Sequence, residues 1–193
     1  MRISQVASVT GVPLPTLKDL RHRSILELAG SGWLDDDDET RRWGSFSVPS
    51  VMVIKGAAEV RETYGLAWKD AIEFTKCALN SIMFIFGGQN IKFFDLRAVP
   101  HEVWAWRFDF GNPDPVMTGD WNYTSGQITA LGESLSAMKT AREVAYVRAQ
   151  KGPSPTLPET TEPKMCLMLN ASRLCRETWY KVQNTNDAEG DEA

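Results

Sequence analysis

The sequence lacks the features of membrane-spanning, secreted and disulfide-rich proteins. Its longest apolar stretch, Ile82 to Phe86, is much shorter than the roughly 18 residues that a spanning helix needs. The amino-terminal residues contain no continuous apolar segment of the kind that a secretory signal requires. Three cysteines without CxxC spacing do not form a disulfide scaffold. We therefore expect a cytoplasmic protein that has no membrane partner and keeps its thiols reduced.

The sequence also lacks the residue patterns that carry catalysis or bind cofactors. It contains no Gly-rich phosphate loop, metal-binding cluster or catalytic triad. The acidic run 35–39 has neither the alternate spacing nor the glycine of a calcium loop, and His101 with Glu102 has no nucleophile at a recognisable spacing. We expect no cofactor, no metal and no enzymatic activity. An enzyme built on residues 81–183 is the least favoured alternative.

An excess of positive charge is absent from the chain as a whole but present near its amino terminus. The formal net charge is −4, which argues against general affinity for nucleic acid. Residues 184–193 carry four acidic residues and no basic one, so residues 1–183 sum to zero. Within residues 1–34, four Arg or Lys residues stand against Asp19 and Glu27, which leaves a local balance of +2. The placement of charge therefore decides which partner the protein binds.

The amino-terminal segment has the pattern of two short helices joined by a tight turn. Apolar residues recur at helical spacing from Ile3, and Gly11 interrupts the pattern where a positive φ suits a turn. A second helix is predicted over residues 15–23, with Leu17 and Leu20 three positions apart on its inner face. This helix then exposes polar and basic side chains, which reach phosphates and base edges when a helix lies in the major groove. The exposed residues are Thr16, Lys18, Arg21, His22 and Arg23.

The rest of the chain mixes helix and strand patterns, so the predicted fold class is α+β. Residues 103–110 alternate strictly, with Trp104, Trp106 and Phe108 on one face, and indicate a half-buried strand with an aromatic face. Four prolines make residues 151–164 an extended linker. The elements predicted after residue 46 are helices at 47–65, 68–79, 133–150 and 171–183, and strands at 81–86, 103–110 and 165–169.

Several segments of the first 80 residues resemble the MerR-type winged helix-turn-helix family. The segments that carry the resemblance are ISQVA at 3–7, TGVPLPTLK at 10–18, IL at 25–26, RRWGSFS at 41–47 and GLAWKDAI at 65–72. The resemblance implies a DNA-binding domain in which the second helix enters the major groove and a wing contacts the backbone. The DNA-binding candidates are then Thr16, Lys18, Arg21, Arg23, Arg41, Arg42 and Trp43.

The sequence departs from that family at three places. Asp19 stands where the family often has an aromatic residue, and on a DNA-facing helix it would repel phosphate or accept a hydrogen bond from a cytosine amino group. The acidic run 35–39 lengthens the loop before the wing. The long dimerisation helix of the family is not obvious in the carboxyl-terminal half.

These observations predict a sequence-specific, double-stranded DNA-binding transcriptional regulator that acts as a homodimer. The alternative is an antitoxin or adaptor protein that binds a protein partner through its carboxyl-terminal half. The predicted parts are a winged helix-turn-helix domain (1–80), an α+β dimerisation or effector domain (81–150), a Pro-rich linker (151–164), a strand–helix element (165–183) and a disordered acidic tail (184–193).

Overall fold

The computed structural model describes seven stretches of the chain, which together form a mixed arrangement of helices and one antiparallel sheet. The predicted fold class, α+β, is confirmed at this level. The described residues are 1–30, 46–87, 102–109, 123–126, 128–149, 163 and 165–190. The elements are α1 (Ile3–Thr10), α2 (Leu14–His22), α3 (Glu27–Gly30), α4 (Val48–Tyr64), α5 (Trp68–Gly87), β1 (Trp104–Asp109), β2 (Tyr123–Gly126), η4 (Ile128–Ala130), α6 (Leu131–Ala149), β3 (Met165–Asn170) and α7 (Ala171–Gly190).

Helices α1 and α2 are joined by a turn that depends on Gly11. This glycine has φ 76° and its N–H donates to the Ala7 carbonyl oxygen at 2.9 Å, so it ends α1 in the left-handed region where a side chain is strained. Leu17 and Leu20 of α2 are fully buried, as the spacing predicted. The two helices therefore form one packed pair with a defined inner face.

Helix α2 ends in a Schellman motif that turns the chain toward α3. The N–H of Ile25 donates to the Leu20 carbonyl oxygen at 2.9 Å, and the N–H of Ser24 donates to the Arg21 carbonyl oxygen at 3.0 Å. Ser24 occupies the left-handed position with φ 55°, where glycine is the usual residue. The motif ends α2 at His22, with Arg23 as the C-cap, and fixes the direction in which the chain leaves the helix.

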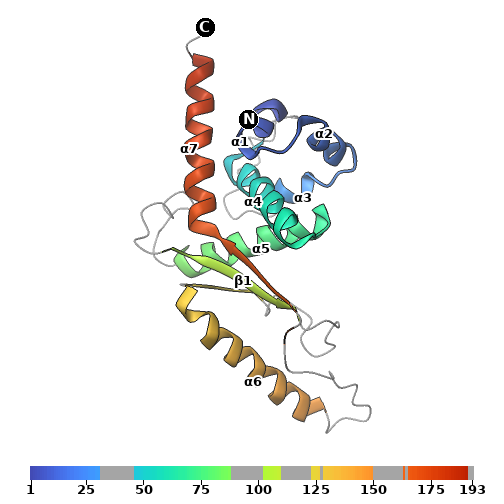
Figure 1. Ribbon diagram of the computed structural model, residues 1–193, viewed down its shortest axis with the longest axis vertical. Helices are drawn as coiled ribbons and strands as arrows, with labels where there is room; N and C mark the ends of the chain where they lie inside the picture. The colour runs from blue at the N-terminus through green and yellow to red at the C-terminus, as the bar shows by residue number, and fades with distance from the viewer. Residues whose placement is uncertain are drawn as a thin grey trace.

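Helices α4 and α5 form the centre of the molecule (Figure 1). Ser47 caps α4, because its Oγ accepts a hydrogen bond from the Ser50 N–H at 3.3 Å. The predicted strand over residues 81–86 is wrong, since α5 continues without interruption to Gly87. A short apolar run fits a buried helical turn as well as a strand, and here it extends a helix that is already formed.

The sheet has the strand order β2–β1–β3, with β1 antiparallel to both neighbours. Strand β1 was predicted to be half-buried, but it is the central strand and both of its faces are covered. Trp106 and Phe108 pack with Met138 of α6 on one face, while Ala105 on the other face is 1% exposed in the main core. Strand β2 is not among the elements predicted from the sequence.

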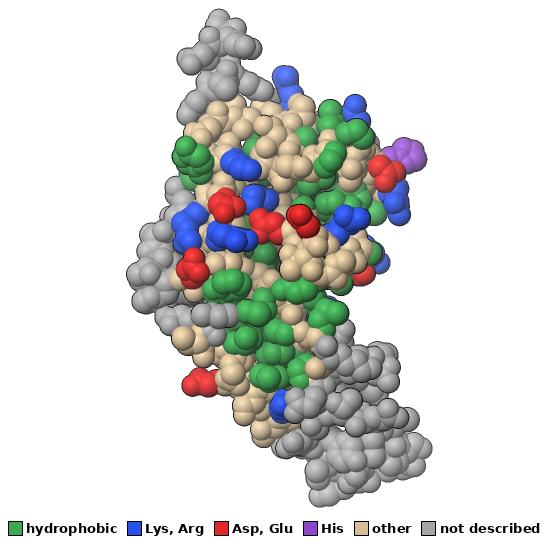
Figure 2. Space-filling view, in the orientation of Figure 1, with side chains coloured by type: hydrophobic (Ala, Val, Ile, Leu, Met, Phe, Trp, Pro, Cys, Tyr) green, Lys and Arg blue, Asp and Glu red, His purple; other side chains and the backbone are tan. Residues whose placement is uncertain are grey.

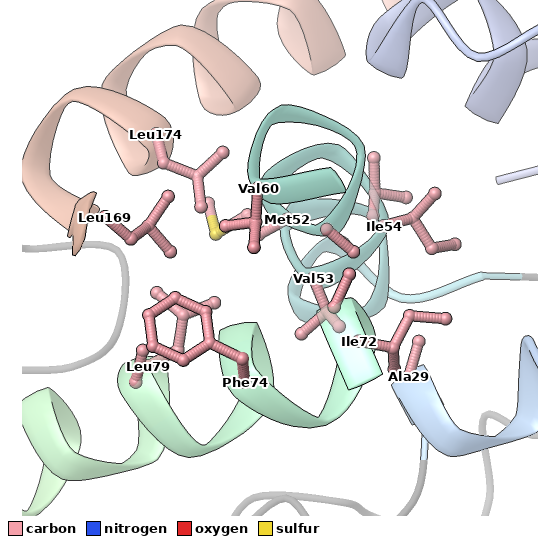
Figure 3. Packing of buried hydrophobic residues seen from close by; sticks show 14 of the residues in the cluster. Ala29, Met52, Val53, Ile54, Val60, Ile72, Phe74, Leu79, Leu169 and Leu174 are labelled. Atoms are coloured by element: carbon pink, nitrogen blue, oxygen red, sulfur yellow. The ribbon is translucent and has the colours of Figure 1, made fainter. Parts of the chain in front are cut away.

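One hydrophobic core runs across the predicted domain boundary at residue 80 (Figure 3). Leu169 of β3 and Leu174 of α7 lie beside Met52 and Val60 of α4, with Phe74 of α5 next to them. The strand and helix at the carboxyl-terminal end therefore complete the core of the amino-terminal helices. They do not form a core of their own.

Helix α7 begins at Ala171, as predicted, and ends later than predicted. The Asn170 side chain accepts a hydrogen bond from the Arg173 N–H at 2.9 Å, as an N-cap does. The helix then continues to Gly190, so the interpretation of residues 184–193 as a disordered tail is wrong for 184–190. Of the predicted linker at 151–164, only Pro163 is described. No helix among the described residues combines the length and apolarity needed to cross a membrane.

Candidate nucleic-acid interface

The outer side of α2 presents three cationic side chains to solvent. Lys18, Arg21 and Arg23 are all exposed, and together they are called the α2 basic face below. The pattern follows from the burial of Leu17 and Leu20, which are 0% and 1% exposed and so fix the inward side of the helix. The fourth candidate of this helix, Thr16, is half-buried at its flank.

One acidic residue stands within this cationic surface. Asp19 lies one turn before Arg23, and its Oδ2 is 3.5 Å from Arg23 Nη1. Both side chains are about three-fifths exposed, at 61% and 62%, so the pair contributes little to the free energy of unfolding, at most about 1 kcal/mol. Lys18 and Arg21 then supply the uncompensated positive charge of the α2 basic face.

The base of the predicted wing is attached to the start of the chain. The Met1 amino group donates to the Phe46 carbonyl oxygen at 2.7 Å, and the Phe46 N–H donates to the Met1 carbonyl oxygen at 2.8 Å. Partial burial lowers the pKa of that amino group. The wing candidates Arg41, Arg42 and Trp43 lie outside the described residues, as does the acidic run 35–39. The described chain stops at Gly30 in α3 and resumes at Phe46, which lies beside Met1.

The carboxyl-terminal helix packs away from the α2 basic face. Helix α7 contacts α1 and α4, and Figure 1 shows it on the opposite side of the helical domain from α2. In the same orientation, Figure 2 shows basic, acidic and histidine side chains gathered at the edge of the molecule that α2 forms.

A second group of charges, which sequence inspection missed, connects α4 with α7. Lys55 Nζ donates to Glu59 Oε1 at 2.6 Å and to Glu177 Oε2 at 2.9 Å, and Arg173 Nη2 donates to Glu59 Oε2 at 3.1 Å. These four residues are called the α4–α7 ion network. The four-residue spacing of Lys55 with Glu59 and of Arg173 with Glu177 was visible in the sequence, but the pairing between the two helices was not.

The pKa values of the network reflect the burial of its lysine. The Lys55 side chain is 7% exposed, and burial alone would lower its pKa, but hydrogen bonds to Glu59 and Glu177 outweigh that effect and the pKa is raised. The hydrogen bond from Lys55 lowers the pKa of Glu177. Because every charge in the network has an opposite partner within it, the network holds two helices together and leaves no charge free for a ligand.

The remaining candidates from the sequence do not assemble into a site. Cys175 is buried, which raises its pKa to about 12, and burial also raises the pKa of Cys166. Thiols of this kind are poor nucleophiles because little thiolate forms. The described residues contain no group of three or more His, Cys, Asp or Glu side chains that could hold a metal ion. His101 lies outside them.

Comparison with known proteins gives no family for the chain. It matches no family model, no curated protein and no solved structure. A function is therefore inferred from the placement, exposure and charge of its own residues.

Proposed function

We propose that this protein is a sequence-specific, double-stranded DNA-binding transcriptional regulator that acts as a homodimer, with a MerR-like winged helix-turn-helix domain in residues 1–80. The observation that carries the proposal is the α2 basic face on a short helix whose inner leucines are buried. This exposed face is the part of the chain whose charge and shape suit the major groove of a duplex.

The charges of the α2 basic face favour phosphate contacts. Lys18 and Arg21 form no salt bridge with an acidic residue among the described residues, so they are available to neutralise phosphates. Each neutralised phosphate releases condensed counterions and makes the affinity depend on salt. Thr16 and Lys18 would approach base edges, and Arg41, Arg42 and Trp43 would contact the backbone from the wing.

The hydrogen bonds between Met1 and Phe46 support this assignment of roles. They hold Phe46, the residue that follows the segment 31–45, beside Met1 at the start of α1, which packs directly against α2. Arg41 and Arg42 precede Phe46 by only a few residues, so in this proposal they would meet the backbone next to the groove that α2 enters. In a homodimer, two protomers would make twice as many phosphate contacts as one, which would offset the negative overall charge of the chain. Once the first protomer is bound, the second would meet its half-site at a raised effective concentration.

The proposal is tested by duplex binding across a salt series, with two lysines as a matched pair. Lys18→Gln should weaken binding about fivefold to tenfold. It should also reduce the magnitude of the slope of log affinity against log salt concentration by about one. Lys181→Gln removes the same charge from the exposed side of α7 and should leave the affinity and the salt dependence unchanged. Arg41→Ala with Arg42→Ala should weaken binding to every duplex and lower the slope by about two. Equal losses for Lys18→Gln and Lys181→Gln would show that binding is a general charge effect.

A protein partner for the carboxyl-terminal half is the second candidate function. It is favoured by the apolar sheet surface beside α6, where Trp104 and Met168 are only partly buried and Met165 is 42% exposed. Figure 2 shows apolar side chains gathered below the α4–α7 region. Light scattering of the purified chain tests the two ideas together. A homodimer that binds duplex DNA agrees with the first, whereas a monomer that binds no duplex and copurifies with another protein agrees with the antitoxin or adaptor alternative.

A further inference from the structure

One acidic side chain, Asp19, lies among the three cationic residues of the α2 basic face. Lys18 and Asp19 are neighbours about 100° apart around the helix axis, and both are exposed on the side of α2 away from Leu17 and Leu20. A carboxylate in that place repels phosphate, which lowers the affinity for DNA of any sequence. A hydrogen bond from Asp19 to a base edge would offset that cost at a matching sequence.

The carboxylate of Asp19 still has room for another hydrogen-bond donor. Arg23 is its partner at 3.5 Å, and the Asp19 side chain remains 61% exposed. An ionised carboxylate has about four lone-pair sites, so one long contact leaves most of them open.

We infer that Asp19 determines sequence specificity by accepting a hydrogen bond from a cytosine amino group, while Lys18 donates to the guanine of the same base pair. The inference rests on the proposed function. In the major groove, cytosine presents its N4 amino donor and guanine presents the O6 and N7 acceptors. Adjacent acceptor and donor side chains match that order of groups.

Adenine fits Asp19 less well than cytosine does. Its N6 amino donor lies beside the N7 acceptor, which carries a partial negative charge and faces the carboxylate. Cytosine has a C–H group at the neighbouring ring position, so a carboxylate meets no second acceptor there. The expected preference is therefore for a C·G pair at one position of each half-site.

The test is selection from a random duplex library, followed by affinity measurements on the selected site and on its single-base variants. The unchanged protein should prefer C·G over other pairs at one position by about tenfold. Asp19→Ala should reduce that preference to about twofold or less and strengthen binding to unrelated duplexes. Asp19→Asn should move the preference toward adenine, because an amide pairs with adenine N6 and N7.

A matched control and two separate negative results make the test decisive. Asp70→Asn makes the same chemical change at an exposed position on α5 and should leave the selected sequence and the general affinity unchanged. If the unchanged protein selects a site and Asp19→Ala selects the same site with the same discrimination, the role of Asp19 is refuted and DNA binding stands. If the unchanged protein binds no duplex at low salt, both the proposed function and this inference are refuted.

Discussion

The α4–α7 ion network and the α2 basic face use the same residue types in opposite ways. In the network, Lys55 is 7% exposed and lies within 2.9 Å of both Glu59 and Glu177. On α2, Lys18 and Arg21 are exposed and form no salt bridge with any acidic residue in the described part of the chain. Charges that are buried and paired hold the fold together, whereas charges that are exposed and unpaired remain available to a partner.

The largest expected effect comes from removing both acceptors of the buried lysine. Glu59→Gln combined with Glu177→Gln should lower the free energy of unfolding by about 3 kcal/mol, because the Lys55 ammonium then stays buried without a counter-charge. Urea denaturation followed by circular dichroism measures the loss. Glu62→Gln with Glu73→Gln removes two exposed carboxylates from α4 and α5 and should change stability by less than about 0.5 kcal/mol. Equal effects of the two pairs would mean that the network is no more structural than a surface charge.

A smaller effect is expected where α4 passes closest to α5 and α7. A Cβ at Gly56 would lie 2.6 Å from Thr75 Cγ2 and 2.7 Å from Leu174 Cδ2. Gly56→Ala should therefore destabilise the protein by about 1–2 kcal/mol, since overpacking outweighs the gain in helix propensity. Gly132→Ala is the control, because a Cβ at that helical position meets nothing within 4 Å. It should stabilise slightly, and a stabilising Gly56→Ala would contradict the close packing of the three helices.

The contribution of the network should depend on pH on the acid side. The pKa of Glu177 is lowered by the hydrogen bond from Lys55, so its stabilisation is present above the ordinary glutamate pKa and is lost as pH falls through the lowered value. The pKa of Lys55 is raised, so its contribution is lost only as pH rises through that raised value. The free energies of unfolding of the unchanged protein and of Glu177→Gln, obtained from urea denaturation, should differ at pH 7 by about 1 kcal/mol or less and converge under strongly acid conditions. A constant difference down to the acid limit would rule out a charged Glu177 as the cause.

The smallest expected effect concerns the end of α2. Ser24 holds a left-handed backbone with φ 55°, which costs a non-glycine residue about 1 kcal/mol. Ser24→Gly should relieve this strain. It should also lose the 3.3 Å contact with Glu27 and raise the conformational entropy of the unfolded chain. The net increase in the free energy of unfolding should be about 0.5 kcal/mol. Ser8→Gly, at an exposed position inside α1, should instead destabilise by about 0.5 kcal/mol. Thermal denaturation distinguishes the two signs, and a loss at Ser24 would contradict the described end of α2.

Most of the helical elements could be predicted because their signals are local. Gly11 ends α1, Ser47 and Asn170 cap α4 and α7, and the three-residue spacing of Leu17 and Leu20 marks the inner face of α2. Each of these depends on residues within one turn of one another. The same local pattern identified the exposed candidates Lys18, Arg21 and Arg23.

The errors occurred where a segment's environment is supplied by distant parts of the chain. The run 81–86 has β-like composition but continues α5 to Gly87. The Ala105 face of β1 was expected to be open, yet it joins the main core beside α4, α5 and α7. In both cases the amino-acid pattern was compatible with two structures, and only the packing partner decides between them.

What the sequence determined by itself is the amino-terminal helix pair and the charges that its second helix presents, because helix periodicity, a turn glycine and caps act over a few residues. Only the tertiary structure decided that the carboxyl-terminal strand and helix belong to the same core, and that Lys55 is paired across 122 positions with Glu177. Burial and ion pairing depend on which surfaces meet in space, and no local pattern specifies that meeting.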